Sequence, residues 1–172
     1  MKQFTLALLA GVAAVASAQG SKTVGDTYPY GISVRAGVVF PIERSFSDFY
    51  SPTLLGLGVD YTFNRPLFKG GETFFSLDFF TSQIGRKGNV VPFMINQRFY
   101  SNARELGSRT YAFVGLGVVF RDTPNNDSTL GGRVGAGLEL SNNVFTEATL
   151  FLSSKRSGIG SNGIGLYAGY RF

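Results

Sequence analysis

The chain has 172 residues and a formal net charge of +5 at pH 7, with a sequence pI near 9.6, and this length is enough for one domain. It contains no cysteine and no histidine, which excludes a disulfide scaffold and removes the commonest general base and metal ligand. The basic residues are scattered along the chain rather than clustered, so anionic lipid phosphates are favoured over nucleic acid as partners.

Residues 1–18 are typical of a secretory signal peptide. Lys2 supplies the positive start, an apolar core runs from Phe4 to Val15, and Ala16-Ser17-Ala18 supplies a small-residue cleavage site. A short N-terminal anchor helix is the alternative, but the apolar run is shorter than the ~20 residues that a spanning helix needs. We therefore expect residues 1–18 to be removed on export and residues 19–172 to form the mature domain.

Beyond the signal, apolar residues alternate with small or polar residues in eight successive segments, a pattern that predicts strands with one apolar face. In chain order these segments are residues 30–40, 54–63, 72–81, 90–100, 109–121, 131–140, 144–152 and 163–172. The last segment alternates as far as Phe172. In a barrel the last strand must pair with the first, so that no edge is left open to lipid. The sequence therefore predicts an all-β fold, an eight-stranded antiparallel up-and-down transmembrane β-barrel.

The predicted strand lengths match the ~9–11 residues that a tilted strand needs to cross a bilayer. The connections after the first, third, fifth and seventh strands are mostly longer and polar, whereas the others are shorter or turn-like, which indicates external loops at one end of the barrel. The longer connections are residues 41–53, 82–89, 122–130 and 153–162.

The faces of the predicted strands differ, because one is aliphatic and aromatic and the other carries the charges. An arginine exposed to lipid at mid-depth would cost about 2–4 kcal/mol, so we expect the charged face to line the lumen. There, cations and anions should balance and plug the barrel as a salt-bridge network, with inward glycines leaving space for the long side chains. The residues of this predicted network are Arg35, Asp60, Asp78, Arg98, Arg133, Glu139, Glu147 and Arg171.

Basic residues in two of the predicted loops are candidates for binding lipopolysaccharide. Arg86 and Lys87 lie in the second longer loop, and Lys155 and Arg156 lie in the fourth. Charge-assisted hydrogen bonds to lipid phosphates are one interpretation. Simple solubility of the loop tips is the other.

The first predicted loop is unusually apolar for an exposed segment, because it contains Phe46, Phe49 and Tyr50. An exposed apolar patch of this kind is typical of an adhesive surface. The alternative is that these rings fold back onto the rim of the barrel.

Taken together, the chain resembles the small outer-membrane β-barrel family, the eight-stranded barrels of the OmpA/OmpX type. The motifs that carry the resemblance are Ala16-Ser-Ala18, Val114-Gly-Leu-Gly-Val118, Glu147 within Phe145-Thr-Glu-Ala-Thr-Leu150, and Tyr170-Arg-Phe172. The resemblance implies a location in the outer membrane of a diderm bacterium, with Tyr170 and Phe172 as the signal that the outer-membrane insertion machinery reads. By default we expect a monomer. The chain departs from the family in having no tryptophan, so tyrosines must serve in the interface belts.

The sequence offers few groups for catalysis. Residues 158–163 match a G-x-G-x-x-G string, but a strand rather than a helix follows, so this segment is interpreted as a loop. The resemblance implies that family enzymes acting on lipid acyl chains use a histidine, which this chain lacks. The carboxylate pairs available for acid–base chemistry are Asp60 with Asp78 and Glu139 with Glu147, and we expect arginine partners to hold each of them ionised.

We therefore expect no enzyme activity, cofactor or metal, and a structural or surface-binding (adhesion) role in contact with outer-membrane lipids. Two alternatives remain open. One is a narrow, porin-like channel along the lumen. The other is a soluble exported lipid-binding barrel, in which the aliphatic face would point inward and the charged face outward.

Overall fold

The computed structural model describes residues 31–63, 67–68, 71–82, 88–101, 109–122, 126–141, 143–155 and 160–172, with only the backbone of residue 49. The predicted signal peptide, Arg86, Lys87 and Arg156 lie outside this part of the chain. Among the described residues, no helix has both the length and the apolar character needed to cross a membrane.

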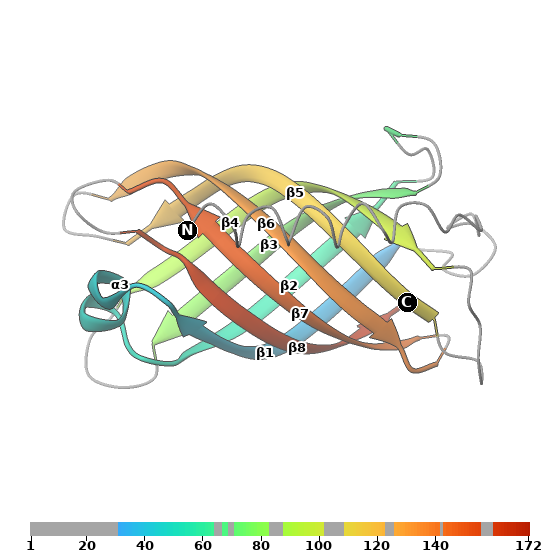
Figure 1. Cartoon of the computed structure of the whole chain (residues 1–172), viewed down its shortest axis with the longest axis horizontal. Coiled ribbons are helices and arrows are strands. Elements are labelled where there is room, and N and C mark those ends of the chain that lie inside the picture. The colour runs from blue at the N-terminus through green and yellow to red at the C-terminus, as the bar shows by residue number, and fades with distance from the viewer. Residues whose placement is uncertain are drawn as a thin grey trace.

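The described residues form one short helix and eight antiparallel strands that close into a barrel (Figure 1). In chain order the elements are β1 (Ile32–Pro41), α3 (Arg44–Phe49), β2 (Leu54–Thr62), β3 (Glu72–Ser82), β4 (Asn89–Tyr100), β5 (Arg109–Arg121), β6 (Asp127–Glu139), β7 (Val144–Ser153) and β8 (Gly163–Arg171). Each strand pairs with the next one, and β8 pairs with β1. The predicted eight-stranded up-and-down barrel is confirmed.

The closing pair has a register that runs the length of both strands. Ser33 lies opposite Arg171 at one end of this pair, and Pro41 lies opposite Gly163 at the other. The backbone N–H of Phe172 also donates to the carbonyl of Ile32 at 2.9 Å. Figure 1 places α3 at one end of the barrel, which we call the loop end, and the C-terminus at the opposite end, which we call the terminus end.

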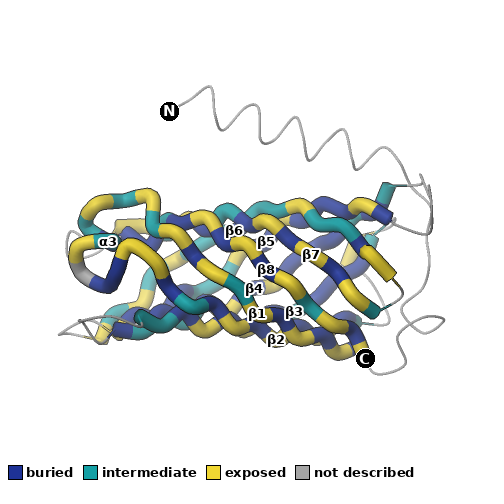
Figure 2. Tube along the Cα trace, turned by 90° about the horizontal axis from the view of Figure 1, so that it is seen from below, coloured by how far each residue is buried: buried dark blue, intermediate teal, exposed yellow. Residues whose placement is uncertain are grey.

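The two faces of the barrel wall are oriented as predicted. Exposed and buried residues alternate along the strands (Figure 2). Leu57 and Leu116 are 45% and 69% exposed on the outside, whereas Arg35 and Glu147 are buried. The inverted arrangement that a soluble lipid-binding barrel would need is therefore not the one observed.

Strand β6 begins earlier than predicted, at Asp127, so part of the expected polar loop 122–130 belongs to the sheet. Residues 127–130 pair with the end of the long strand β5, and Arg121 Nε donates to the Asp127 carboxylate at 2.7 Å across this pair. Because cross-strand pairing overrides the local turn composition here, the connection after β5 is as short as a turn. The expected alternation of long and short connections is therefore incomplete.

Candidate functional site

The barrel interior falls into three layers, and the middle one is charged. The Arg35 guanidinium reaches from β1 to the next two strands along the chain, with Nη1 at 2.5–2.6 Å from both oxygens of Asp60 and Nη2 at 2.6 Å from Oδ1 of Asp78. Arg133 Nη1 donates to the other oxygen of Asp78 at 3.1 Å. Asp78 is thus held between two guanidinium groups, and all four side chains are almost completely buried.

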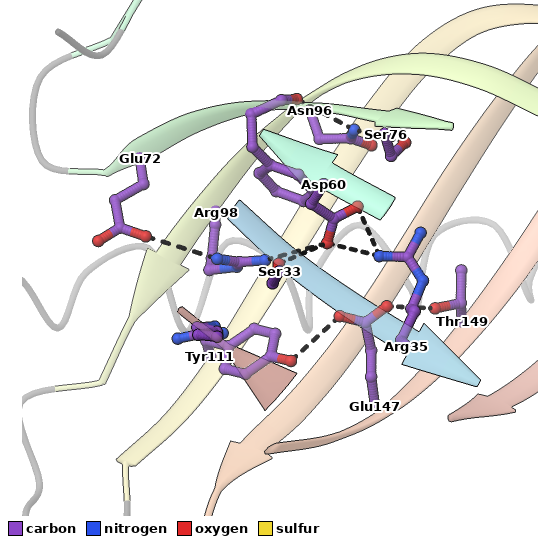
Figure 3. A network of polar contacts seen from close by, with 12 residues as sticks. Ser33, Arg35, Asp60, Glu72, Ser76, Asn96, Arg98, Tyr111, Glu147 and Thr149 are labelled. Atoms are coloured by element: carbon purple, nitrogen blue, oxygen red, sulfur yellow. Dashed lines mark hydrogen bonds and ion pairs between the residues drawn. The ribbon is translucent and has the colours of Figure 1, made fainter. Parts of the chain in front are cut away.

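Neutral side chains extend the charged layer toward β3 and β4. Arg133 Nε donates to Asn96 Oδ1 at 2.6 Å, and Asn96 Nδ2 donates to the Ser76 hydroxyl at 3.1 Å (Figure 3). These contacts hold both the oxygen and the nitrogen of the Asn96 amide. Asn96 on β4 therefore connects Arg133 on β6 with Ser76 on β3.

We expected an arginine partner for Glu147, but its carboxylate binds hydroxyl groups instead. Its carboxylate accepts hydrogen bonds from the hydroxyls of Tyr111 at 3.1 Å and Thr149 at 3.0 Å (Figure 3). Among the residues that the structure describes, Glu147 makes no ion pair. Arg133 comes from the adjacent strand β6 but points toward Asp78 and Asn96 instead.

The layer at the terminus end combines arginines with aromatic rings. Arg98 lies 4.3 Å from the ring centre of Phe74 and 4.9 Å from that of Tyr111, and Arg171 lies 4.8 Å from that of Phe145. Cations placed over ring faces are attracted to them electrostatically. The arginines of this layer therefore have stabilising contacts besides their carboxylate partners.

Two charged residues of this layer were not among the predicted network. Arg109 Nε donates to Glu139 at 3.0 Å, and Arg171 also binds Glu139. Glu72 lies 3.5 Å from Arg98 and accepts a hydrogen bond from Tyr100 at 2.7 Å. The sequence contained the signal for Arg109 and Glu72, because each starts its strand at an inward position of the two-residue alternation.

The layer at the loop end is apolar. Its residues are Val39, Phe46, Tyr50, Leu54, Phe80, Val90, Met94, Val119, Phe151 and Tyr167. Sequence reasoning missed this layer because it assigned the inward face to polar side chains. The signal was the continuous apolar character of Val38-Val-Phe40, Val118-Val-Phe120 and Leu150-Phe-Leu152, in which the middle residue is buried and points inward.

Helix α3 closes the loop end with two aromatic side chains. Phe46 and Tyr50 are only 1% and 2% exposed, and their rings meet edge to face at 5.2 Å. Of the two interpretations of this loop, folding back onto the barrel is therefore the one observed for Phe46 and Tyr50, and they form no exposed adhesive patch. The sequence did not predict α3, since a helix of six residues is too short to show a periodic pattern.

Hydrogen bonds fasten the first connection to the strands around it. The Tyr50 hydroxyl donates to the carbonyl of Asp122 at 3.2 Å, and the Ser82 hydroxyl donates to the carbonyl of Tyr50 at 3.0 Å. Burial raises the pKa of Tyr50 to about 12, so this hydroxyl keeps its proton, and can donate, to a higher pH than a solvated tyrosine does.

Glu43 fastens the same connection to the one between β7 and β8. Its Oε1 accepts from Asn162 Nδ2 at 2.6 Å, and its Oε2 lies 3.5 Å from Nζ of Lys155. Lys155, one of the basic residues predicted to meet lipid phosphates, is 64% exposed. An exposed pair of this kind contributes little to stability, so Lys155 remains accessible to anions.

A cavity in the interior at the terminus end is too small for a substrate. The cavity of about 10 Å³, bordered by Ser33, Glu72 and Arg98 among others, has room for about one water molecule. Within the described ranges, no three acidic side chains are grouped to hold a metal ion. Asp60 and Asp78, one of the two carboxylate pairs considered for acid–base chemistry, are both bound by Arg35.

Comparisons with models of protein families and with curated proteins gave no match. Comparison with solved structures gave several barrels of outer-membrane proteins. The N-terminal β-barrel domain of Pseudomonas aeruginosa OprF is 20% identical, with 82% of this chain and 96% of that one covered and a TM-score of 0.50. The outer-membrane enzyme PagL is 13% identical, with 81% and 98% covered and a TM-score of 0.58.

The Yersinia pestis outer-membrane protein Ail, determined in a phospholipid bilayer nanodisc, is 16% identical, with 83% of this chain and 99% of that one covered and a TM-score of 0.52. Because one of these proteins is an enzyme, the fold alone does not decide for or against catalysis. The closed strand order and these likenesses together lead to one conclusion about architecture. The chain has the fold of the eight-stranded outer-membrane β-barrels.

Proposed function

We propose that the chain is an outer-membrane barrel of a Gram-negative bacterium, exported with a cleaved signal peptide, and that it acts as a sealed, non-catalytic structural or surface-binding protein. The observation that carries the proposal is the filled interior. Arg35, Asp78 and Arg133 connect the non-adjacent strands β1, β3 and β6 across the middle, and the rings of Phe46 and Tyr50 close the loop end. A filled lumen favours this role over a narrow channel.

Placement in a membrane is supported by the apolar outer wall. The experiment compares Leu116→Arg with Leu67→Arg. Both leucines have similar exposed fractions, 69% and 66%, but Leu116 lies in the middle of β5 and Leu67 lies in the connection between β2 and β3. In a bilayer the first substitution costs about 2–4 kcal/mol near the midplane and the second much less.

The measurement is membrane fractionation combined with heat-modifiable gel migration, which reports the folded barrel. We expect wild type and Leu67→Arg to fractionate with the outer membrane as folded barrels, and Leu116→Arg to give less folded protein. Recovery of the mature wild-type protein in aqueous buffer without urea or detergent would overturn the membrane placement and favour a soluble barrel.

A surface-binding role would rest on the basic loop residues Arg86, Lys87, Lys155 and Arg156 and on lipopolysaccharide phosphates as the ligand. Buried Phe46 and Tyr50 offer no exposed patch in this arrangement. Replacing the four basic residues by glutamine should weaken binding to lipopolysaccharide micelles and leave gel migration unchanged. Equal binding by this variant and wild type would contradict the surface-binding role, and only the structural role would remain.

Assembly would depend on Tyr170 and Phe172 as the signal read by the insertion machinery, with a monomer as the product. Phe172→Ala should lower the yield of folded barrel in cells but not the yield on refolding into vesicles. Phe120→Ala is the matched control, because Phe120 is also outward-facing and half exposed. An equal loss in both variants would indicate lost lipid contact rather than a signal.

A further inference from the structure

At the loop end the barrel wall is apolar on both of its faces. Val38 and Phe40 are exposed on the outside of β1, whereas Val39 between them is completely buried inside. Phe79 and Phe80 repeat this arrangement on β3. A lumen that only had to be plugged could use polar side chains throughout, as the middle layer does. The inward apolar residues need another explanation.

These inward residues surround a region that we call the loop-end chamber, defined by Val39, Leu54, Phe80, Met94, Val119 and Phe151. Its floor is Tyr167, with the Arg35 guanidinium 5.5 Å from the ring centre. From Val90 to Met94 the wall extends for about 13 Å along β4, at 3.3 Å per residue. The chamber is therefore closed below by the charged layer and is deep enough for the end of an extended chain.

In the structure the chamber is occupied by side chains of a short segment, α3 and the residues beside it. Helix α3 has six residues, and its N-cap Glu43 makes no side-chain capping hydrogen bond, so the helix is not stable by itself. Its polar contacts include those of Glu43 with Asn162 and Lys155 at the rim, and those of Tyr50 with the Asp122 carbonyl and the Ser82 hydroxyl. What inserts into the chamber are the rings of Phe46 and Tyr50.

We propose that the loop-end chamber binds the end of a single hydrocarbon chain, as in a fatty acid, and that residues 43–50 are a lid whose Phe46 and Tyr50 rings fill the chamber when no chain is bound. An apolar chain can replace the rings because most of the chamber wall is aliphatic or aromatic. The hydrogen bond from the Tyr50 hydroxyl to the carbonyl of Asp122 is lost when the rings leave. The carboxylate of the ligand stays at the rim, where Lys155 is released from Glu43 when the lid lifts. This site goes beyond the structural role and rests on it only for the membrane placement.

The experiment uses tryptophan as a reporter, because the chain has none. Phe80→Trp places the indole in the chamber, and Phe79→Trp places it one residue away on the outer wall as the matched control. The probes are fatty acids brominated near the methyl end or near the carboxyl end, and vesicles of brominated phosphatidylcholine, because bromine quenches indole fluorescence at short range. Phe151→Trp, on the opposite wall, is a second inward reporter should Phe80→Trp not fold.

We expect brominated phosphatidylcholine to quench Phe79→Trp and not Phe80→Trp. The fatty acid brominated near its methyl end should quench Phe80→Trp, and the one brominated near its carboxyl end should not. Adding Glu43→Ala should tighten the apparent affinity about tenfold, since loss of about one charge-assisted hydrogen bond raises the open fraction by that factor. Arg44→Ala, at an exposed position of the same helix, should leave the affinity unchanged.

The proposal is overturned if neither fatty acid quenches the inward reporters more than brominated phosphatidylcholine does, with or without Glu43→Ala. It is also overturned if Phe46→Ala/Tyr50→Ala, which empties the chamber, binds no better than wild type. Failure of the membrane placement gives a different result, because Phe79→Trp would then escape quenching by brominated phosphatidylcholine.

Discussion

At the position of Gly58, an added methyl group would crowd the charged layer. A Cβ atom there would lie 2.5 Å from Oδ1 of Asp78 and 2.7 Å from Nε of Arg35. The alternation of the strands predicted that Arg35 and Asp78 point inward, because that choice depends only on residue parity. It could not predict that Glu147 bonds to hydroxyls, because the partner depends on the level at which neighbouring strands meet and on the direction of each long side chain.

Gly58→Ala should lower the free energy of unfolding by about 1–3 kcal/mol, since overpacking forces buried side chains to shift. The measurement is the urea midpoint of the barrel refolded in vesicles. Gly132→Ala is the control, because the nearest atoms to its added Cβ would be 3.3 Å away, and it should change stability much less. An equal loss of stability in Gly58→Ala and Gly132→Ala would contradict this prediction, because it would show that the side chains of Arg35 and Asp78 can move away from the added methyl group without a free-energy cost.

Asp78→Asn should lower the free energy of unfolding by about 3–5 kcal/mol, because it leaves Arg35 and Arg133 short of a buried counter-charge. Adding Arg133→Met should recover part of this loss, since it restores the charge balance of the layer. The same urea titration measures both variants. A double variant less stable than the sum of the two single changes would contradict a charge-balance explanation.

The elements differ in how far the sequence determines them. The strands were predictable because alternation with a period of two recurs in each of them, although consecutive apolar residues interrupt it near the loop end. The start of β6 was not, because residues 127–130 look like a turn and become a strand only through pairing with β5. Helix α3 was not predictable either, because its fold depends on Phe46 and Tyr50 finding the chamber rather than on helical periodicity.

The raised pKa of Tyr50 makes closure of α3 sensitive to alkaline pH. Burial moves this pKa from 10.0 to about 12, so the closed form retains the proton that a solvated tyrosine would lose. Its contribution to closure is complete below pH 10 and declines between pH 10 and about 12. The difference in tyrosinate absorbance between wild type and Tyr50→Phe should titrate near 12, and Glu43→Ala should move that midpoint toward 10.0; an unchanged midpoint would argue against lid opening.

For the whole molecule, the overall architecture was the most predictable feature, because an even number of alternating strands with an apolar outer face leaves few arrangements other than a closed barrel. The division of the interior into three layers was not predicted. It arises where the tilted strands bring inward residues from distant parts of the sequence to one level, as with Val39 and Val119 in the loop-end chamber.

The purified barrel in planar bilayers should show no steady conductance. The double variant Asp78→Asn/Arg133→Met should be equally silent, although its charged layer is depleted, because the loop-end chamber is a second barrier. Large open steps in wild type would refute the sealed interior. Steps in the double variant alone would show that the charged layer is the whole seal.

The apolar lining of the loop-end chamber also determines how the protein responds to voltage. A hydrophobic constriction excludes ions by dewetting, and stripping an ion of its hydration costs at least several kcal/mol when no charge replaces the lost water. A membrane potential of 100 mV supplies only about 2.3 kcal/mol per elementary charge. A potential of this size is therefore smaller than the barrier that the apolar end of the barrel presents to an ion.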